Sequence, residues 1–264
     1  MTATPTVTPA STPAVTPSDA QAAAPTPVQA TKRALLVAAL GSMPYAKALG
    51  VQRAAAQARI DGKLTDDLLM LVEHPPVITL GRSTNSDNLL IAAEALAARA
   101  VELFEVDRGG DVTFHGPGQL VGYPIIDLRL HREDLHWYLR QLEETLIRAL
   151  SNFGIPAERR EKLTGVWTHG RKIASIGVHA KQWVTWHGFA LNVTTDLSYF
   201  GMMVPCGIEN VEMTSVAKEL GVNPGSSAWS SLGGQAQAAV TNAFGAVFGL
   251  VPQASELRNL GLGR

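Results

Sequence analysis

The sequence contains one cysteine, Cys206, and its surroundings make it a candidate for nucleophilic chemistry. A proline precedes it and a glycine follows it, which predicts a tight loop. A lone cysteine is more often a small buried hydrophobic residue, because only a thiolate is a good nucleophile and a thiolate needs a nearby cation or base. The residues that could supply this partner are Lys172, His115, His169, His179 and His187.

Lys172 stands apart from the other lysines because a run of apolar and small residues, Ile-Ala-Ser-Ile-Gly-Val, follows it. A lysine in that position is either a solvated charge at the end of a strand or a cation held against a reactive centre. The pattern by itself favours the solvated side chain. The cysteine and the lysine therefore suggest a reactive pair without establishing one.

The stretch 108–119 reads Arg-Gly-Gly-Asp-Val-Thr-Phe-His-Gly-Pro-Gly-Gln and contains four glycines. Such a composition fits an ordinary turn between two strands, or backbone that approaches a ligand closely. The stretch lacks the Gly-Lys-Ser/Thr ending of a phosphate-binding loop and opens no predicted helix, which argues against a nucleotide site of that kind. We expect it to form one wall of a pocket.

Composition limits the classes of protein that fit. With 264 residues and 46% hydrophobic residues, the chain can bury a sizeable core. A formal net charge of -1 gives no electrostatic argument for nucleic acid or an anionic membrane surface. One cysteine excludes an intrachain disulfide and points to a reducing compartment, so we expect a cytoplasmic protein. No apolar run approaches the roughly 18 to 20 residues that span a bilayer.

The first 31 residues differ from the rest of the chain. They are rich in proline, threonine and alanine, and their only charged residue is Asp19. The segment lacks the basic and apolar regions of a secretory signal, and its prolines oppose regular structure. We expect a disordered tail over 1–31 and a single folded domain over 32–264.

The hydrophobic pattern predicts strands interleaved with helices, and hence one α/β or α+β domain with a mixed sheet. Asp134 is the expected N-cap of the most strongly patterned helix, and Pro124 is expected to mark a sheet edge or a bulge. Three strands after 164 fit an antiparallel meander. The predicted strands are 34–40, 68–72, 77–80, 101–106, 120–128, 165–168, 172–178 and 183–191, and the predicted helices are 44–60, 92–100, 134–153, 214–220 and 233–248.

Five segments occur in an order that resembles one family. They are His-Pro-Pro-Val-Ile-Thr-Leu-Gly at 74–81, the stretch 108–124, Lys-Ile-Ala-Ser-Ile-Gly-Val at 172–178, Gly-Phe-Ala-Leu-Asn at 188–192 and Pro-Cys-Gly-Ile at 205–208. Together they resemble the octanoyl-[acyl carrier protein]:protein octanoyltransferases of lipoate biosynthesis, over roughly Arg33 to Leu220. The resemblance implies the mixed sheet flanked by helices that lipoate and biotin protein ligases share.

The resemblance also implies a mechanism and partners. Cys206 would carry the acyl group as a thioester, and Lys172 would lower the thiol pKa and shuttle the proton, without a cofactor or a metal. The donor would be octanoyl-acyl carrier protein, and the acceptors would be lipoyl domains of 2-oxoacid dehydrogenase E2 subunits and the glycine cleavage H protein. Residues expected to line the acyl site are Arg108, Gly109, Gly110, Asp111, Val112, Thr113, Phe114, His115, Ser175, Ile176, Gly177, Gly188, Phe189 and Ala190.

Several alternatives remain open at this stage. The oxyanion donors are either backbone N–H groups beside Cys206 or in the glycine-rich stretch, or His115, which we expect to face the reacting carbonyl. Phe114 is expected to wall in the acyl chain. Arg159, Arg160 and Lys162 form either a basic patch for the carrier protein or a solvated loop. The rival functions are a lipoate–protein ligase, an amidotransferase between lipoyl domains, and a catalytically silent binding module.

Overall fold

The structure is a computed structural model that describes residues 1–4, 33–208 and 211–262. The predicted disordered tail lies outside the described residues, apart from its first four. The contacts divide the chain into Met1–Thr31 and Lys32–Arg264, and the helices and strands of the described residues belong to the second unit.

A mixed sheet of eight strands runs through this unit in the order β11-β1-β2-β6-β10-β9-β8-β7. Strands β11, β1 and β2 are parallel, whereas the pairings from β2 through β6 to β7 are antiparallel. The strands are β1 (Ala34–Ser42), β2 (Asp67–Glu73), β6 (Gln119–Ile125), β7 (Glu158–Arg160), β8 (Leu163–Thr168), β9 (Arg171–Lys181), β10 (Val184–Asn192) and β11 (Val251–Ala254). The mixed sheet and the β8-β9-β10 meander confirm the expectations from the sequence.

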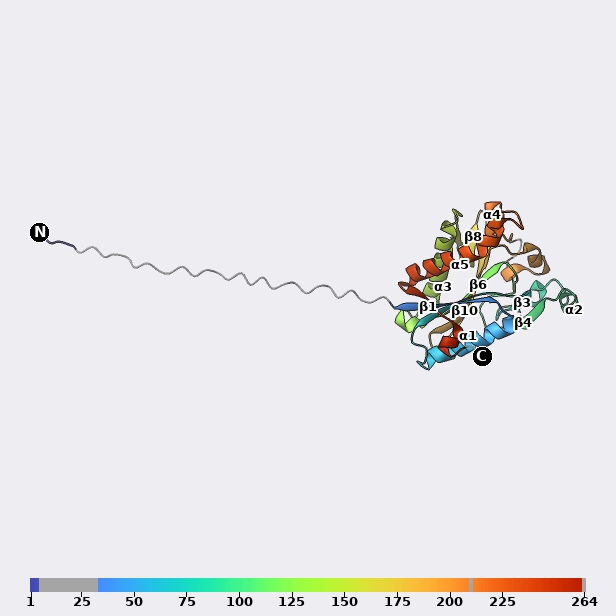
Figure 1. Cartoon of the computed structure of the whole chain (residues 1–264), viewed down its shortest axis with the longest axis horizontal. Helices are drawn as coiled ribbons and strands as arrows, with labels where there is room; N and C mark the ends of the chain where they lie inside the picture. The colour runs from blue at the N-terminus through green and yellow to red at the C-terminus, as the bar shows by residue number, and fades with distance from the viewer. Residues whose placement is uncertain (5–32, 209–210, 263–264) are drawn as a thin grey trace. The chain divides into compact units, whose positions relative to one another are not determined.

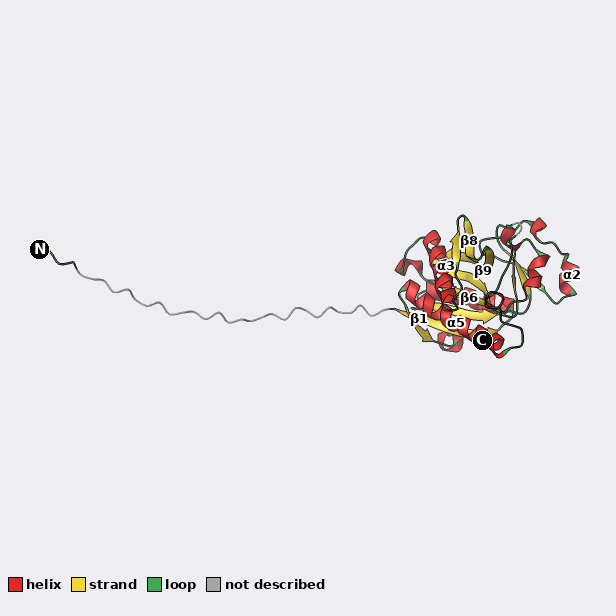
Figure 2. Cartoon of the chain, turned by 90° about the horizontal axis from the view of Figure 1, so that it is seen from above, coloured by secondary structure: helices red, strands yellow, loops and turns green. Residues whose placement is uncertain are grey.

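Helices cover both faces of this sheet (Figures 1 and 2). Helices α3 (Leu135–Ser151) and α5 (Ser227–Phe248) lie on one face, and α1 (Tyr45–Ile60) lies on the other. In β2, Leu69 and Leu71 pack under α3 and α5, whereas Leu68 and Met70 pack toward α1. Because alternate side chains of a strand point to opposite faces, β2 is apolar along its whole length.

A smaller sheet, β4-β3-β5, extends the fold at the side that carries α2 (Ala93–Ala97). Its strands are β3 (Val77–Leu80), β4 (Glu102–Glu105) and β5 (Thr113–His115). The short helix α4 (Val216–Leu220) precedes α5, and Ser215 caps its first turn. Asp134 caps α3 by accepting a hydrogen bond from the backbone N–H of Trp137, as predicted. Among the described residues, no helix is both long and apolar enough to cross a membrane.

Three local expectations need correction. Pro124 does not mark a sheet edge, because β6 lies between β2 and β10; the regular ladder with β10 stops at Gly122 instead. Helix α5 begins at Ser227 rather than at 233, since Ser226 caps it and the glycine pair at 233–234 lies inside it. Part of the glycine-rich stretch is strand, because β5 pairs with β3.

Candidate active site

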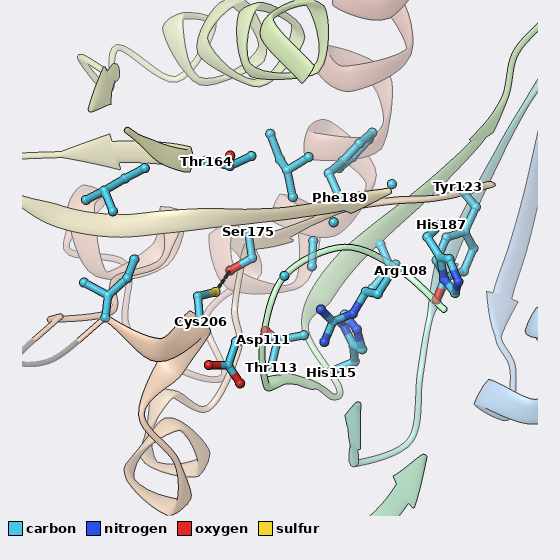
Figure 3. A pocket seen from close by; sticks show the side chains of 18 of the residues that line it. Arg108, Asp111, Thr113, His115, Tyr123, Thr164, Ser175, His187, Phe189 and Cys206 are labelled. Carbon is cyan, nitrogen blue, oxygen red and sulfur yellow. Dashed lines mark hydrogen bonds between the residues drawn. The ribbon is translucent and has the colours of Figure 1, made fainter. Parts of the chain in front are cut away.

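Cys206 and Lys172 meet although 34 residues separate them. The Lys172 ammonium donates a hydrogen bond to the Cys206 sulfur over 3.1 Å, and the Ser175 hydroxyl lies 3.8 Å from the same sulfur. Figure 3 shows the side chains of Cys206 and Ser175 pointing toward one another. Lys172 is fully buried, so the solvated lysine that the pattern favoured is wrong.

A short turn, η4 (Pro205–Gly207), holds the thiol in place. Cys206 has φ 57° and ψ 23°, a left-handed conformation that a non-glycine residue rarely adopts. Its backbone N–H donates to the carbonyl of Val112 over 3.0 Å, which ties the turn to the glycine-rich stretch. The Asp111 carboxylate lies against Gly207, and Asn88 donates a hydrogen bond to that carboxylate. Two loops that are far apart in the sequence therefore fix the nucleophile.

Both backbone groups of Lys172, its N–H and its carbonyl, form hydrogen bonds with the segment that follows Cys206. Its N–H donates to the carbonyl of Glu212 over 2.8 Å, and its carbonyl accepts from the N–H of Thr214 over 2.9 Å. On the neighbouring strand β8, the Trp167 ring lies 5.2 Å from the ammonium. These contacts leave the side chain directed at Cys206.

The electrostatics of the cavity favour a thiolate. Burial raises the pKa of the Cys206 thiol, but the Lys172 ammonium, the hydrogen bonds from Lys172 and Ser175, and the Arg108 charge lower it by more. The net pKa lies below the ordinary value for cysteine. Arg108 is itself buried, and its guanidinium donates to the carbonyl and hydroxyl of Thr79 rather than to a carboxylate in the described part of the chain.

A cavity of about 220 Å³ opens in front of Cys206. It is smaller than the roughly 300 Å³ at the lower end for sites of drug-sized ligands, which suits a slender chain. In Figure 3, Cys206 and Ser175 lie on one side of Arg108, and Tyr123 and His187 lie on its other side. The residues from the sequence analysis that line the cavity with Cys206 are Arg108, Gly110, Asp111, Thr113, His115, Ser175, Ile176, Gly177, Gly188, Phe189 and Ala190.

Three of the expected residues lie elsewhere. Gly109 donates its N–H to the carbonyl of Val178 and does not line the cavity. Val112 and Phe114 are buried in a separate core cluster, where Phe114 stacks on Tyr199. Phe114 therefore supports the glycine-rich stretch from behind and is not a wall of the cavity.

Several residues that line the cavity were not among those that the sequence analysis expected to line it, although His187 was named there as a possible partner of Cys206. They come from α1, β6, β8, β10 and the turns that border Cys206 and β8: Tyr45, Val121, Tyr123, Lys162, Leu163, Thr164, His187 and Ile208. Tyr123 belongs to the family-like stretch 108–124, which was a signal for its importance. Of the three basic residues considered as a patch, Lys162 borders the cavity, whereas Arg159 pairs with Glu143 and Glu144.

His115 offers the cavity a hydrogen-bond acceptor. The Gln119 amide donates to the Phe114 carbonyl and to Asn192, so its oxygen accepts the hydrogen bond of 2.8 Å from His115 Nδ1. Burial, aided by the nearby His74, lowers the pKa of His115 to about 3. The neutral ring thus carries its proton on Nδ1, and Nε2 can only accept. This tautomer does not suit His115 to stabilise an oxyanion.

Backbone N–H groups are the other candidates for donors to an oxyanion. The N–H groups of Cys206 and Gly207 already donate to Val112 and Val204. In contrast, the N–H groups of Gly110 and Asp111, both of which line the cavity, donate to no other group in the described ranges. These two are the strongest candidates for oxyanion donors.

Comparison with known proteins shows the family to which the chain belongs. The sequence profile of the lipoyl protein ligase A/B catalytic domain matches residues 44–230. An octanoyltransferase from Solibacter usitatus is 54% identical over 178 residues, which are 67% of this chain and 80% of the relative. The chain belongs to the octanoyltransferases of this family. A second octanoyltransferase, from Gloeobacter violaceus, is 46% identical over 80% of this chain and 88% of its own length.

Solved structures confirm the family's fold. A lipoate-protein ligase A bound with ATP superposes with a TM-score of 0.67 at 13% identity, covering 88% of this chain and 92% of that chain. A lipoate protein ligase from Thermoplasma acidophilum gives a TM-score of 0.66 at 15% identity, covering 88% and 90%. At these identities the likeness concerns the fold alone.

Proposed function

We propose that this octanoyltransferase moves the octanoyl group from acyl carrier protein to the lysine amine of a lipoyl domain through a thioester on Cys206. The observation that carries the covalent step is the contact of 3.1 Å between the buried Lys172 ammonium and the Cys206 sulfur. A thiolate stabilised by a buried cation is the reactive form of a cysteine nucleophile.

In the first half of the reaction, the Cys206 sulfur attacks the octanoyl carbonyl of the donor thioester. The bond from that carbonyl carbon to Cys206 Sγ forms, and the bond to the sulfur of the carrier's phosphopantetheine breaks. Lys172 gives its proton to the departing thiolate and becomes neutral. The N–H groups of Gly110 and Asp111 would donate to the oxyanion of the intermediate.

In the second half, the lysine amine of the lipoyl domain attacks the enzyme thioester. The neutral Lys172 accepts a proton from the attacking nitrogen, the C–N bond forms, and the bond to Cys206 Sγ breaks. The enzyme returns to a thiolate beside an ammonium. Conversion of a thioester into an amide is downhill, so the transfer needs no nucleotide.

The partners follow from the family to which the chain belongs. We infer that the donor is octanoyl-acyl carrier protein and that the acceptors are lipoyl domains of 2-oxoacid dehydrogenase E2 subunits and the glycine cleavage H protein. A reducing compartment such as the cytoplasm would keep the Cys206 thiol available.

Intact-protein mass spectrometry tests this function. Wild-type enzyme incubated with octanoyl-acyl carrier protein should gain one octanoyl group that hydroxylamine removes, and Cys206→Ala should gain none. Addition of a lipoyl domain should discharge the adduct and leave the domain with an amide that resists hydroxylamine. Absence of the adduct on wild-type enzyme would contradict the covalent mechanism, and modification that requires free octanoate and ATP would indicate a ligase instead.

A further inference from the structure

Lys172 is a buried cation without a carboxylate partner among residues 33–208 and 211–262. Its side chain is fully buried, yet it forms no salt bridge with any carboxylate in the described part of the chain. The hydrogen bond that its ammonium makes there is the one to Cys206. A buried charge is unfavourable unless something compensates it, and this compensation disappears whenever Cys206 is protonated or acylated.

A second compensating group is the ring of Trp167. The ammonium of Lys172 lies 5.2 Å from the centre of this ring, within the distance of about 6 Å at which a cation is attracted to an aromatic face. Trp167 and Lys172 are partners across the β8-β9 pair, and both are fully buried. The indole is thus desolvated, which strengthens the attraction.

The backbone around the pair leaves room for the lysine stem. Gly165, two residues before Trp167, has φ +138°, and a Cβ there would lie 2.9 Å from Lys172 Cε and 2.7 Å from the carbonyl of Ala174. A larger residue at 165 would push the stem out of its place. Gly165 and Trp167 therefore leave space for the Lys172 side chain between them.

We propose that Trp167 is a positioning residue of the transfer, whose indole face holds the Lys172 side chain charged and directed at Cys206. This proposal rests on the proposed function only in assigning the pair to acyl transfer. The ring is present at every stage, whereas the thiolate is consumed when the thioester forms. In the second half-reaction the ring therefore favours the step in which neutral Lys172 takes a proton from the attacking amine.

Other charged groups near the pair are engaged elsewhere. Arg108 and Asp111 approach from the glycine-rich stretch, Arg160 of β7 lies over the Trp167 ring at 5.8 Å, and Glu143 of α3 accepts the N–H of Gly165. Asp111 accepts from Asn88 and from the N–H of Val112, and Glu143 pairs with Arg140 and Arg159. Arg160 donates to the carbonyl of Gly170. Arg160 thus offers a matched control, because it contacts the same ring without contacting Cys206.

Thiol alkylation tests the proposal directly. Because Cys206 is the only cysteine, the rate of iodoacetamide labelling of the full chain reports on this thiol alone. We expect Trp167→Leu to move the midpoint of the rate-against-pH curve upward by about one unit, which is a tenfold loss of thiolate below the midpoint. The midpoint for Trp167→Phe, which keeps an aromatic face, should lie between the midpoints of Trp167→Leu and wild type. Arg160→Gln should have the wild-type midpoint.

A double-mutant cycle separates an effect through Lys172 from general damage. In the Lys172→Met background, Trp167→Leu should produce no further shift of the midpoint. A folded Trp167→Leu protein with the wild-type midpoint would overturn the proposal, as would a shift that persists without Lys172. Because alkylation needs no octanoyl donor, it succeeds or fails independently of octanoyl transfer, which the mass assay reports.

Discussion

Cys206 and Lys172 form a reactive pair because burial removes the Lys172 ammonium and most of the Cys206 thiol from water. In water a lysine would be solvated and a cysteine thiol would stay largely protonated at neutral pH. The sequence could identify Cys206 because it is unique and lies between a proline and a glycine. The burial of Lys172 could not be predicted, since it depends on Trp167 and on backbone bonds to Glu212 and Thr214, which no local pattern encodes.

Substitutions of Lys172 should separate two effects of this residue: its positive charge, which lowers the pKa of Cys206, and the proton that it transfers. In Lys172→Met, burial continues to raise the pKa of Cys206 while the largest influence that lowers it is gone. The thiolate fraction at pH 7 therefore falls, and we expect at least a tenfold slower formation of the octanoyl adduct, measured by rapid-quench mass spectrometry. Raising the pH should recover part of this loss, because a higher pH restores the thiolate.

Lys172→Arg serves as the matched variant. It keeps the positive charge but has no accessible neutral form. We expect its alkylation rate to stay much closer to wild type than that of Lys172→Met, while turnover to the lipoyl domain is lost. Equal alkylation rates in the two variants would show that the charge of Lys172 does not act on Cys206.

The larger elements were predictable where they have their own hydrophobic pattern, either a period or a continuous apolar run. Strands β2, β8, β9 and β10 and helix α3 have such patterns, and the structure confirms them. Strands β5, β7 and β11 have only three or four residues, too few to show a period, and they exist because neighbouring strands offer hydrogen bonds. The first turns of α5 were missed because two glycines resemble a helix end, whereas packing on the sheet keeps the helix continuous.

The contact between η4 and the glycine-rich stretch should be sensitive to one added methyl group. Gly207 has φ +66°, and a Cβ there would lie 2.5 Å from the Asp111 carboxylate, which Asn88 and the N–H of Val112 hold in place. We expect Gly207→Ala to displace Cys206 and to slow adduct formation at least tenfold, measured by the mass assay.

Gly221 provides the control for backbone strain alone. It has φ +63° at the end of α4, and a Cβ there would meet nothing within 4 Å. Gly221→Ala should lower the free energy of unfolding by about 1 kcal/mol and leave the rate of adduct formation unchanged. Similar rates in the two alanine variants would mean that the contact with Asp111 does not position the thiol.

The cavity as a whole is assembled from parts of the chain that only the fold brings together. Tyr45 begins α1, Tyr123 lies on the central strand β6, and His187 lies on β10. The family-like segments identified the reactive end of the cavity because the chemistry there requires particular residue types. Its other end escaped prediction, since aromatic and histidine side chains at those positions are equally typical of a packed core.

Three buried histidines, His74, His115 and His187, should make the stability of the whole molecule depend on pH. Burial lowers the pKa of His74 and of His187 to about 4 and that of His115 to about 3, against an ordinary value near 6.5. Between 6.5 and about 4 the unfolded chain binds protons that the folded protein does not. Their contribution to stability is therefore complete above pH 6.5 and is lost as the pH falls.

The expected loss is about 2 kcal/mol for each of these histidines between pH 7 and pH 5, at about 1.4 kcal/mol per pH unit and proton. Urea unfolding at a series of pH values measures this slope. His115→Gln should reduce the slope between pH 6 and 5 by about one proton, even if it lowers the stability at pH 7. His136→Gln, at an exposed position on α3, is the matched control substitution. A slope that His115→Gln does not change would mean that burial does not lower the pKa of His115 in the folded protein.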